Sequence, residues 1–209
     1  MNFFTSLDEL VDRRSVLRHP FYTRWSAGEL TREELARYSG QYRHAVTALA
    51  AASARAAQLA DDEQTRAQLE CHAAEERAHV ELWDSFVHAV GGEPGSRPTP
   101  ETEHCAVAWA GDSDRGLLPT LVALYAIESS QPAIAATKRQ GLAEHYAIAG
   151  DGASYFVLHE ERDVEHAQAA RELIERRLDG HDPQALLEEA ERVLDANWIL
   201  LDGVERLAA

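Results

Sequence analysis

Hydrophobic residues recur at intervals of three to four positions along most of this chain, which is the spacing of amphipathic helices. This pattern predicts helices over about 6–18, 31–60, 62–90, 113–139, 141–148, 152–178 and 182–207, and short helical material over about 101–110. No segment alternates hydrophobic and polar residues between hairpin turns, as a half-buried strand would. The sequence therefore predicts an all-α bundle of about seven helices in a single domain spanning 1–209.

Short local signals indicate where several of these helices begin and end. Ser6 followed by Glu9, and Thr31 followed by Glu34, both have the spacing of a capping box, in which side chains satisfy the first backbone N–H groups of a helix. Two consecutive glycines at 91–92 end the helix over 62–90, and a loop rich in proline follows over 93–100. Pro132 lies inside the helix predicted over 113–139, so we expect a kink there.

The charge and composition exclude several classes of partner. A net charge of −16 argues against nucleic acid and against an anionic membrane, because both require a basic surface. The N-terminal segment lacks the features of a signal peptide, and no window approaches the roughly 18 apolar residues of a transmembrane helix. Cys71 and Cys105 are too few for a disulfide framework. We therefore expect a cytoplasmic protein.

The octapeptide at 159–166 carries the strongest chemical signal. At about 100° per residue, His159, Asp163 and His166 fall within an arc of about 60° on one helix face. Two imidazoles and a carboxylate on one face suit iron, manganese or zinc. Taken alone, the octapeptide fits a solvated helix face with two chance histidines about equally well, and matching ligands on other helices favour the metal site.

A second set of candidate ligands lies on the helix predicted over 62–90. Glu76 and His79 have the Glu-x-x-His spacing of dimetal sites in helical bundles, and Glu76 lies near the centre of the apolar stripe. Glu75 is turned about 100° away and is the alternative ligand. His72, one turn before Glu76, fits a packed histidine better than a ligand.

Glu128 is the only charged residue between Leu117 and Ala136, and it lies on the stripe expected to be buried. A buried carboxylate needs a metal or a basic partner, and the alternative is a partly exposed glutamate at a helix edge. The predicted metal ligands are therefore Glu76, His79, Glu128, His159, Asp163 and His166. This set suits two transition-metal ions, Fe/Fe or Mn/Fe, since zinc usually takes fewer ligands and calcium avoids imidazole.

Lys138 is the only lysine, because 19 of the 20 basic residues are arginine. A lysine amine can lose its proton and act as a nucleophile, whereas arginine stays charged in proteins. On this residue alone, a leftover lysine on a solvated turn is the favoured interpretation. The motifs on either side of Lys138 indicate a different role for it.

Several motifs resemble those of the haem-oxygenase-like superfamily, which includes TenA and PqqC. The opening His19-Pro20-Phe21-Tyr22-Thr23-Arg24-Trp25 is similar to the start of that superfamily. The segments 124–132 and 159–167, with the lysine between them, resemble its diiron oxidases and within these the CADD group. Two departures are that the segment between Glu75-Glu76 and His79 is about three residues shorter, and that Ile127 stands where these relatives carry an aromatic.

The resemblance implies an O2-activating dimetal cluster held by the six ligands, with O2 and an external reductant as cosubstrates. The CADD group further implies synthesis of p-aminobenzoate for folate from the protein's own side chains. Tyr22 would supply the ring and Lys138 the amine, while Tyr38 and Tyr155 match tyrosines near the cluster. The resemblance is also compatible with a homodimer and implies an unidentified electron donor as partner.

Other functions stay open on sequence alone. The same cluster could serve as an oxidase or oxygenase of an external amino-acid-like or fatty-acid small molecule, by N-oxygenation or C–C cleavage, because a fold does not fix a function. A metal-free enzyme of the thiaminase or PqqC type, or a protein-interaction module, would leave the six ligands unexplained.

Overall fold

The computed structural model describes residues 2–208, and within this range it is helical and contains no strand. The elements in chain order are α1 (Phe3–Arg13), η1 (Val16–Arg18), α2 (Pro20–Ala27), α3 (Arg32–Leu59), α4 (Glu63–Val90), α5 (Pro100–Ala110), α6 (Leu117–Glu128), α7 (Gln131–His145), η2 (Gly150–Ala153), α8 (Ser154–Glu175) and α9 (Pro183–Ala208), with η marking short 3-10 helices. The all-α prediction is confirmed.

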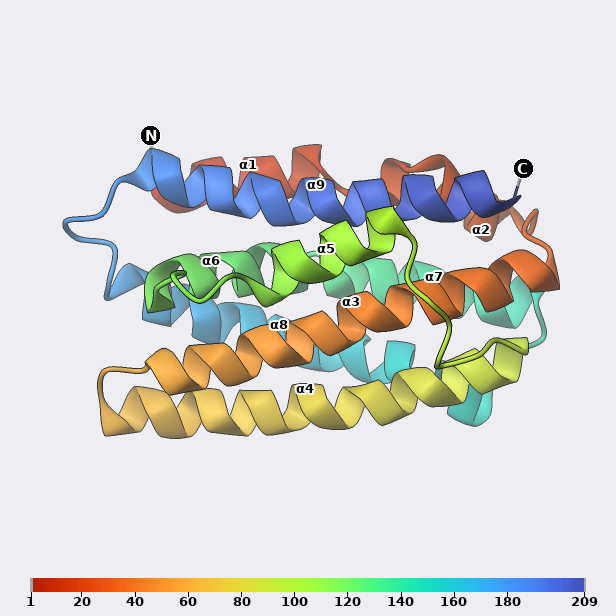
Figure 1. Ribbon diagram of the computed structural model, residues 1–209, viewed down its shortest axis with the longest axis horizontal. Coiled ribbons are helices and arrows are strands. Elements are labelled where there is room, and N and C mark those ends of the chain that lie inside the picture. The colour runs from red at the N-terminus through yellow and green to blue at the C-terminus, as the bar shows by residue number, and fades with distance from the viewer. Residues whose placement is uncertain (1, 209) are drawn as a thin grey trace.

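The long helices lie side by side along the longest axis of the molecule (Figure 1). α3 packs against α4 along its length, α8 packs against α4, α6 and α7, and α9 covers α1, α5 and α6. α6 is apolar on every side, and almost all of its residues are buried, so it lies in the centre of the bundle. Among the described residues, none of the helices is both long and apolar enough to cross a membrane.

Helix starts follow the side chains that can cap them. Thr31 accepts a hydrogen bond from the Glu34 backbone, and the Glu34 carboxylate accepts one from the Thr31 backbone, so this predicted capping box is confirmed. The predicted cap at Ser6 is wrong. α1 begins earlier, at Phe3, where the side chain of Asn2 accepts a hydrogen bond from the Phe4 N–H. Burial of both phenylalanines favours the longer helix.

The helix predicted over 113–139 is two helices. α6 ends at Glu128 and α7 begins at Gln131, so the chain turns at two serines instead of kinking at the proline. Pro132 lies in the first turn of α7, where its missing N–H leaves no hydrogen bond unmade. α7 then continues to His145 and absorbs most of the separate helix predicted over 141–148. This break places Glu128 at the end of the central helix.

Candidate metal centre

Three helices bring the six predicted ligands together in the interior of the bundle. α4 supplies two of them, α6 supplies its last residue and α8 supplies three, in the order Glu76, His79, Glu128, His159, Asp163 and His166. All six are buried, and even the most accessible, His166, is only 9% exposed. The candidate ligands that the sequence places on three separate helices therefore meet in the folded structure.

The ligand atoms lie close to one another without being bonded to other groups. Oε1 of Glu76 is 3.0 Å from Nδ1 of His79 and 3.7 Å from Nδ1 of His166. Oδ1 of Asp163 is 3.6 Å from the same His166 nitrogen. Glu128 carries no exposed surface at all. Three carboxylates buried among imidazoles at such distances favour positive charge in the cluster.

The hydrogen-bond pattern tests whether this cluster fits a metal. Within the described residues, both carboxylate oxygens of Glu76, Glu128 and Asp163 are buried and accept no hydrogen bond. Nδ1 of His79, Nε2 of His159 and Nδ1 of His166 are also without a partner. Each buried polar group left unpaired costs about 1–3 kcal/mol. Metal ions coordinated by these atoms would remove that cost, so the donor set fits iron or manganese.

The orientation of His159 is set by the backbone of its own helix. Its Nδ1 donates a hydrogen bond to the carbonyl oxygen of Tyr155 at 2.7 Å, so Nε2 carries the lone pair and faces the cluster. Burial lowers the pKa of His159 to about 4, which keeps the imidazole neutral at physiological pH. His159 is therefore held in the form that a metal ion requires.

The surroundings of Asp163 and His166 in the cluster raise the pKa values of both residues. Burial raises the pKa of Asp163 to about 7. Burial acts to lower the pKa of His166, but the carboxylates of Asp163, Glu128 and Glu75 outweigh it and raise this pKa to about 9. The cluster thus attracts protons as it would attract any cation.

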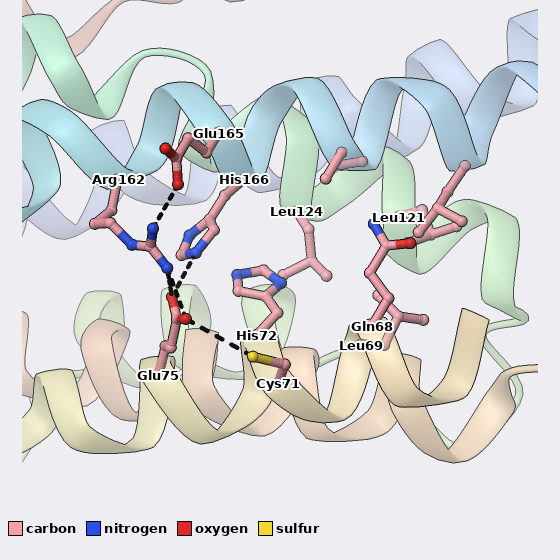
Figure 2. A pocket seen from close by; sticks show the side chains of 13 residues that line it. Gln68, Leu69, Cys71, His72, Glu75, Leu121, Leu124, Arg162, Glu165 and His166 are labelled. Atoms are coloured by element: carbon pink, nitrogen blue, oxygen red, sulfur yellow. Dashed lines mark hydrogen bonds and ion pairs between the residues drawn. The ribbon is translucent and has the colours of Figure 1, made fainter. Parts of the chain in front are cut away.

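Glu75 and Glu76 occupy different environments. Glu76 is 1% exposed and points into the cluster, whereas the side chain of Glu75 is 29% exposed and lies outside it. Glu75 accepts two hydrogen bonds from Arg162, at 2.7 and 2.9 Å, and a third from Nε2 of His166 at 2.9 Å (Figure 2). The structure therefore places Glu76 among the candidate ligands and gives Glu75 the position of a residue that orients His166.

The structure also brings in His72, for which the sequence favoured a packed histidine. His72 points into the cluster from α4, with Nε2 3.1 Å from Oε1 of Glu128. Its spacing offered a signal, because positions 72, 76 and 79 follow the four-then-three pattern of a single helix face. Four imidazoles, and not three, thus surround the three carboxylates.

Lys138 lies in a cage of aromatic rings and not on a solvated turn, so that interpretation is wrong. The residue is 1% exposed, and its Nζ is 4.5 Å from the ring centre of Tyr42 and 5.3 Å from that of Tyr22. Tyr38, Trp83 and Phe156 complete the cage. Burial lowers the pKa of Lys138 to about 7. The sequence did not indicate this cage, since its five rings come from four different helices.

Aromatic contacts connect the cage to the cluster. The hydroxyl groups of Tyr22 and Tyr38 are hydrogen-bonded at 3.0 Å. Trp83 lies between Tyr38 and Tyr155, with ring centres 6.0 and 4.8 Å away. Tyr155 in turn stacks on the imidazole of His159 at 3.8 Å. The three predicted tyrosines therefore belong to one continuous set of rings that reaches a candidate metal ligand.

A pocket of about 370 Å³ approaches the cluster between α4, α6 and α8 (Figure 2). Its walls are mainly apolar side chains, and it reaches His72 and His166. Arg162 also lines it, together with Glu75 and Glu165, to both of which Arg162 is ion-paired. Solvent and small molecules thus have a route toward the cluster beside these two histidines.

Comparison with known proteins agrees with an iron site. Residues 33–198 match the model of a family described as iron-containing redox enzymes, and this range contains every residue of the cluster. The chain belongs to this family. The resemblance to haem-oxygenase-like oxidases, noted from the motifs, is thereby confirmed. A helical iron-containing redox enzyme is also the class of protein that the buried carboxylates and imidazoles fit.

Individual relatives of this iron-containing redox enzyme cover nearly its whole length. A 4-aminobenzoate synthase of Chlamydia trachomatis is 34% identical over 97% of this chain and 92% of its own. A 4-aminobenzoate synthase of Nitrosomonas europaea is 32% identical over 97% of this chain and 90% of its own.

Among solved structures, a TenA homolog from Pseudomonas syringae pv. tomato matches with a TM-score of 0.79 at 17% identity, covering 98% of this chain and 91% of its own. The TenA homologue from P. horikoshii matches equally well at 16% identity, covering 99% of both chains. These two likenesses show the shared fold.

Proposed function

We propose that this iron-containing redox enzyme makes p-aminobenzoate (4-aminobenzoate) from its own Tyr22, with Lys138 as the amine donor. The observation that carries the proposal is the burial of the only lysine against the ring of Tyr22, 5.3 Å from its centre, in a chain whose relatives are named 4-aminobenzoate synthases. The tyrosine side chain contains the required carbon skeleton, because its ring and Cβ match the ring and carboxyl carbon of the product.

The candidate ligands Glu76, His79, Glu128, His159, Asp163 and His166 would hold a pair of ions, Fe/Fe or Mn/Fe. When bound, such a pair supplies O2-dependent oxidation, with an external reductant providing the remaining electrons. Tyr155, stacked on His159, and Tyr38, hydrogen-bonded to Tyr22, lie on the route by which electrons would leave Tyr22.

Lys138 meets the chemical requirement for an amine donor. Its pKa of about 7 leaves a large fraction of the amine neutral near physiological pH, so its nitrogen lone pair is available to attack the ring. The surrounding rings exclude water, which protects a reactive ring from competing hydrolysis. In the product, the nitrogen of Lys138 would replace the phenolic oxygen of Tyr22, which would leave as water, so the Cε–Nζ bond of the lysine would break. The Cα–Cβ bond of Tyr22 would also break as Cβ becomes the carboxyl carbon, and O2 would be the oxidant for these cleavages.

Because the chain has a single lysine, one isotope experiment tests the amine source directly. Protein made with lysine labelled by ¹⁵N at Nζ carries this label only at Lys138. After anaerobic loading with Fe(II), with and without Mn(II), O2 and a reductant are added. We expect ¹⁵N-labelled p-aminobenzoate, together with loss of the Tyr22 side chain in peptide mass spectra.

Variants separate the two roles. Tyr22→Phe and Lys138→Arg should both abolish the product, and Lys138→Met serves where the buried arginine prevents folding. Tyr146→Phe is the control, since Tyr146 lies outside the Lys138 cage and contacts Trp25. Unlabelled product, or undiminished product from Tyr22→Phe, would contradict the proposal.

The pocket favours one second candidate, an oxidase of an external small molecule. Its volume of about 370 Å³ is in the range of small-molecule sites, and it approaches His72 and His166. An amino-acid-like or fatty-acid substrate would then undergo N-oxygenation or C–C cleavage over many turnovers. Consumption of O2 with an unchanged polypeptide would select this candidate, whereas consumption limited to one turnover per chain would exclude it.

A further inference from the structure

His72 occupies a position in which a merely packed histidine would be poorly satisfied. Its Nε2 lies 3.1 Å from Oε1 of Glu128 and 3.8 Å from Oε1 of Glu76. Within the described residues, this buried nitrogen makes no hydrogen bond, and neither do the oxygens of the two carboxylates. A group that lacks a partner while facing other groups that lack partners indicates a missing species that all of them would bind.

The donor atoms fall into two overlapping groups. One atom each from His72, Glu76, Glu128 and His166 lies within 4.8 Å of all the others. A second group of the same compactness consists of Glu76, His79 and His159. Ligands bound at about 2.1 Å on opposite sides of an ion are about 4.2 Å apart, so each group needs only a small contraction to coordinate one ion. Glu76 belongs to both groups.

We propose that His72 is a metal ligand and that the centre consists of two unequal positions bridged by Glu76. The outer position would be held by His72, Glu128 and His166, with Asp163 beside it at 3.6 Å from Nδ1 of His166, and the inner position would be held by His79 and His159. This inference builds on the dimetal centre of the proposed function and adds a ligand and a division of the site. It concerns metal binding alone and does not depend on the identity of the substrate.

The surroundings distinguish the two positions. His72 and His166 line the apolar pocket, so the outer ion is the one that small molecules reach first. His79 and His159 are 3% and 1% exposed, and His159 stacks on Tyr155 at the end of the aromatic contacts. The inner position therefore lies beside Tyr155, and the outer position lies beside the pocket.

Metal stoichiometry tests this assignment without any measurement of activity. The protein is loaded anaerobically with Fe(II) or Mn(II), desalted and analysed by elemental mass spectrometry. We expect two ions per chain for the wild type and one for His72→Ala. His88→Ala is the matched control, because His88 lies exposed on the same helix and should leave two ions bound.

Two further measurements separate ligation from packing. His72→Gln keeps most of the side-chain volume, and circular dichroism verifies that both variants are folded. Added imidazole can enter through the pocket and occupy the space left by His72→Ala, so it should restore the second ion. Electron paramagnetic resonance of the Mn(II) form should change from a coupled pair to an isolated ion in the variants, and return with imidazole.

The outcomes distinguish this inference from the proposed function. Two ions in both folded His72 variants would overturn the ligand assignment and leave the dimetal oxidase standing. A wild-type protein that binds fewer than two ions would overturn the two-position centre and the dimetal part of the proposed function together. If a His72 variant binds two ions and still makes labelled p-aminobenzoate, the proposed function stands and only the ligand role of His72 is rejected.

Discussion

At the scale of single residues, Lys138 shows how burial changes chemistry. The five surrounding rings offer cation–π attraction, which favours the charged amine by about 0.5–2 kcal/mol per good contact. Loss of hydration opposes this and prevails, since burial lowers the pKa from 10.5 to about 7. No carboxylate among residues 2–208 is ion-paired with Lys138. A neutral amine is therefore accessible in the folded protein at physiological pH.

This shift predicts a pH-dependent stability that Lys138→Met should remove. Below pH 7 the amine is protonated in both folded and unfolded chains. Between about 7 and 10.5 only the unfolded chain keeps the proton, so the free energy of unfolding should rise with pH across this window. Relative to Lys138→Met, the free energy of unfolding should rise by at most about 1.4 kcal/mol per pH unit.

Urea denaturation of metal-free protein between pH 6 and 10.5 measures this difference, and other titrating groups cancel in the comparison. Lys138→Arg is a useful control, because a buried guanidinium cannot lose its proton and should be destabilising across the whole window. A constant difference between wild type and Lys138→Met would show that the amine does not titrate in this range.

A residue that contradicts its surroundings in the sequence is a good indicator of a buried polar position. Glu128 stands out as the lone charge in an apolar segment, and the structure buries it completely beside the other candidate ligands. The shared face of His159, Asp163 and His166 follows from helical spacing alone. His72 shares a helix face with Glu76 and His79, but its contact with Glu128 depends on which helices become neighbours, and so does the contact of the Tyr42 ring with Lys138.

At the scale of helices, the close approach of α2 and α7 positions Tyr22 beside Lys138. Gly141 on α7 lies directly against Trp25 on α2, where an added Cβ would be 2.6 Å from the indole Cδ1. The indole N–H also donates a hydrogen bond to the carbonyl oxygen of Lys138, at 3.2 Å. The absence of a side chain at 141 therefore sets the distance between the two helices that carry the proposed substrate and amine donor.

Gly141→Ala should consequently be destabilising, although alanine favours helices. The gain in helix propensity is about 1 kcal/mol, whereas forcing a methyl group into a packed interface costs about 1–3 kcal/mol. Trp25 is fully buried and cannot move aside easily. We expect a lower free energy of unfolding in urea and a lower yield of p-aminobenzoate, as Tyr22 and Lys138 shift apart.

Gln140→Ala on the exposed side of α7 is the control, and it should change the free energy of unfolding by less than about 0.5 kcal/mol. Equal stability of the two variants would show that α2 and α7 can separate freely.

Helix boundaries were predictable where the cap is local and not where tertiary packing decides. The capping box at Thr31 needs only residues three positions apart, and it is confirmed. The start of α1 depends on burying Phe3 and Phe4 against the rest of the bundle, which no local pattern reveals. The break between α6 and α7 precedes Pro132 for the same kind of reason, since α6 ends where Glu128 enters the cluster.

At the scale of the whole molecule, negative charge is concentrated both outside and inside the bundle. The chain has a net charge of −16, and three carboxylates without hydrogen-bond partners lie at its centre. The metal-free protein should therefore be less stable than its size allows, since buried charges of like sign repel. Metal binding relieves this repulsion and links metal affinity to the stability of the entire fold.

Thermal unfolding measures that linkage, and we expect Fe(II) or Mn(II) under anaerobic conditions to raise the Tm of the wild type. An ion at 100 times its Kd adds about 2.7 kcal/mol for each site that it occupies. Glu128→Gln should have opposite effects on the Tm of the metal-free protein and on the increase in Tm that metal causes. Replacing one buried carboxylate by a neutral amide should raise the Tm of the metal-free protein, while the loss of a ligand should reduce the increase caused by metal.

Glu161→Gln provides the matched control, because Glu161 lies exposed on α8 and its replacement removes the same charge from the chain. If the net charge of the molecule governs stability, both variants should raise the Tm of the metal-free protein equally and respond to metal like the wild type. If the buried cluster governs it, only Glu128→Gln should gain stability without metal and lose the response to metal. If metal raises the Tm of the two variants equally, Glu128 is not a ligand. Replacing a coordinating carboxylate would weaken the binding of its ion.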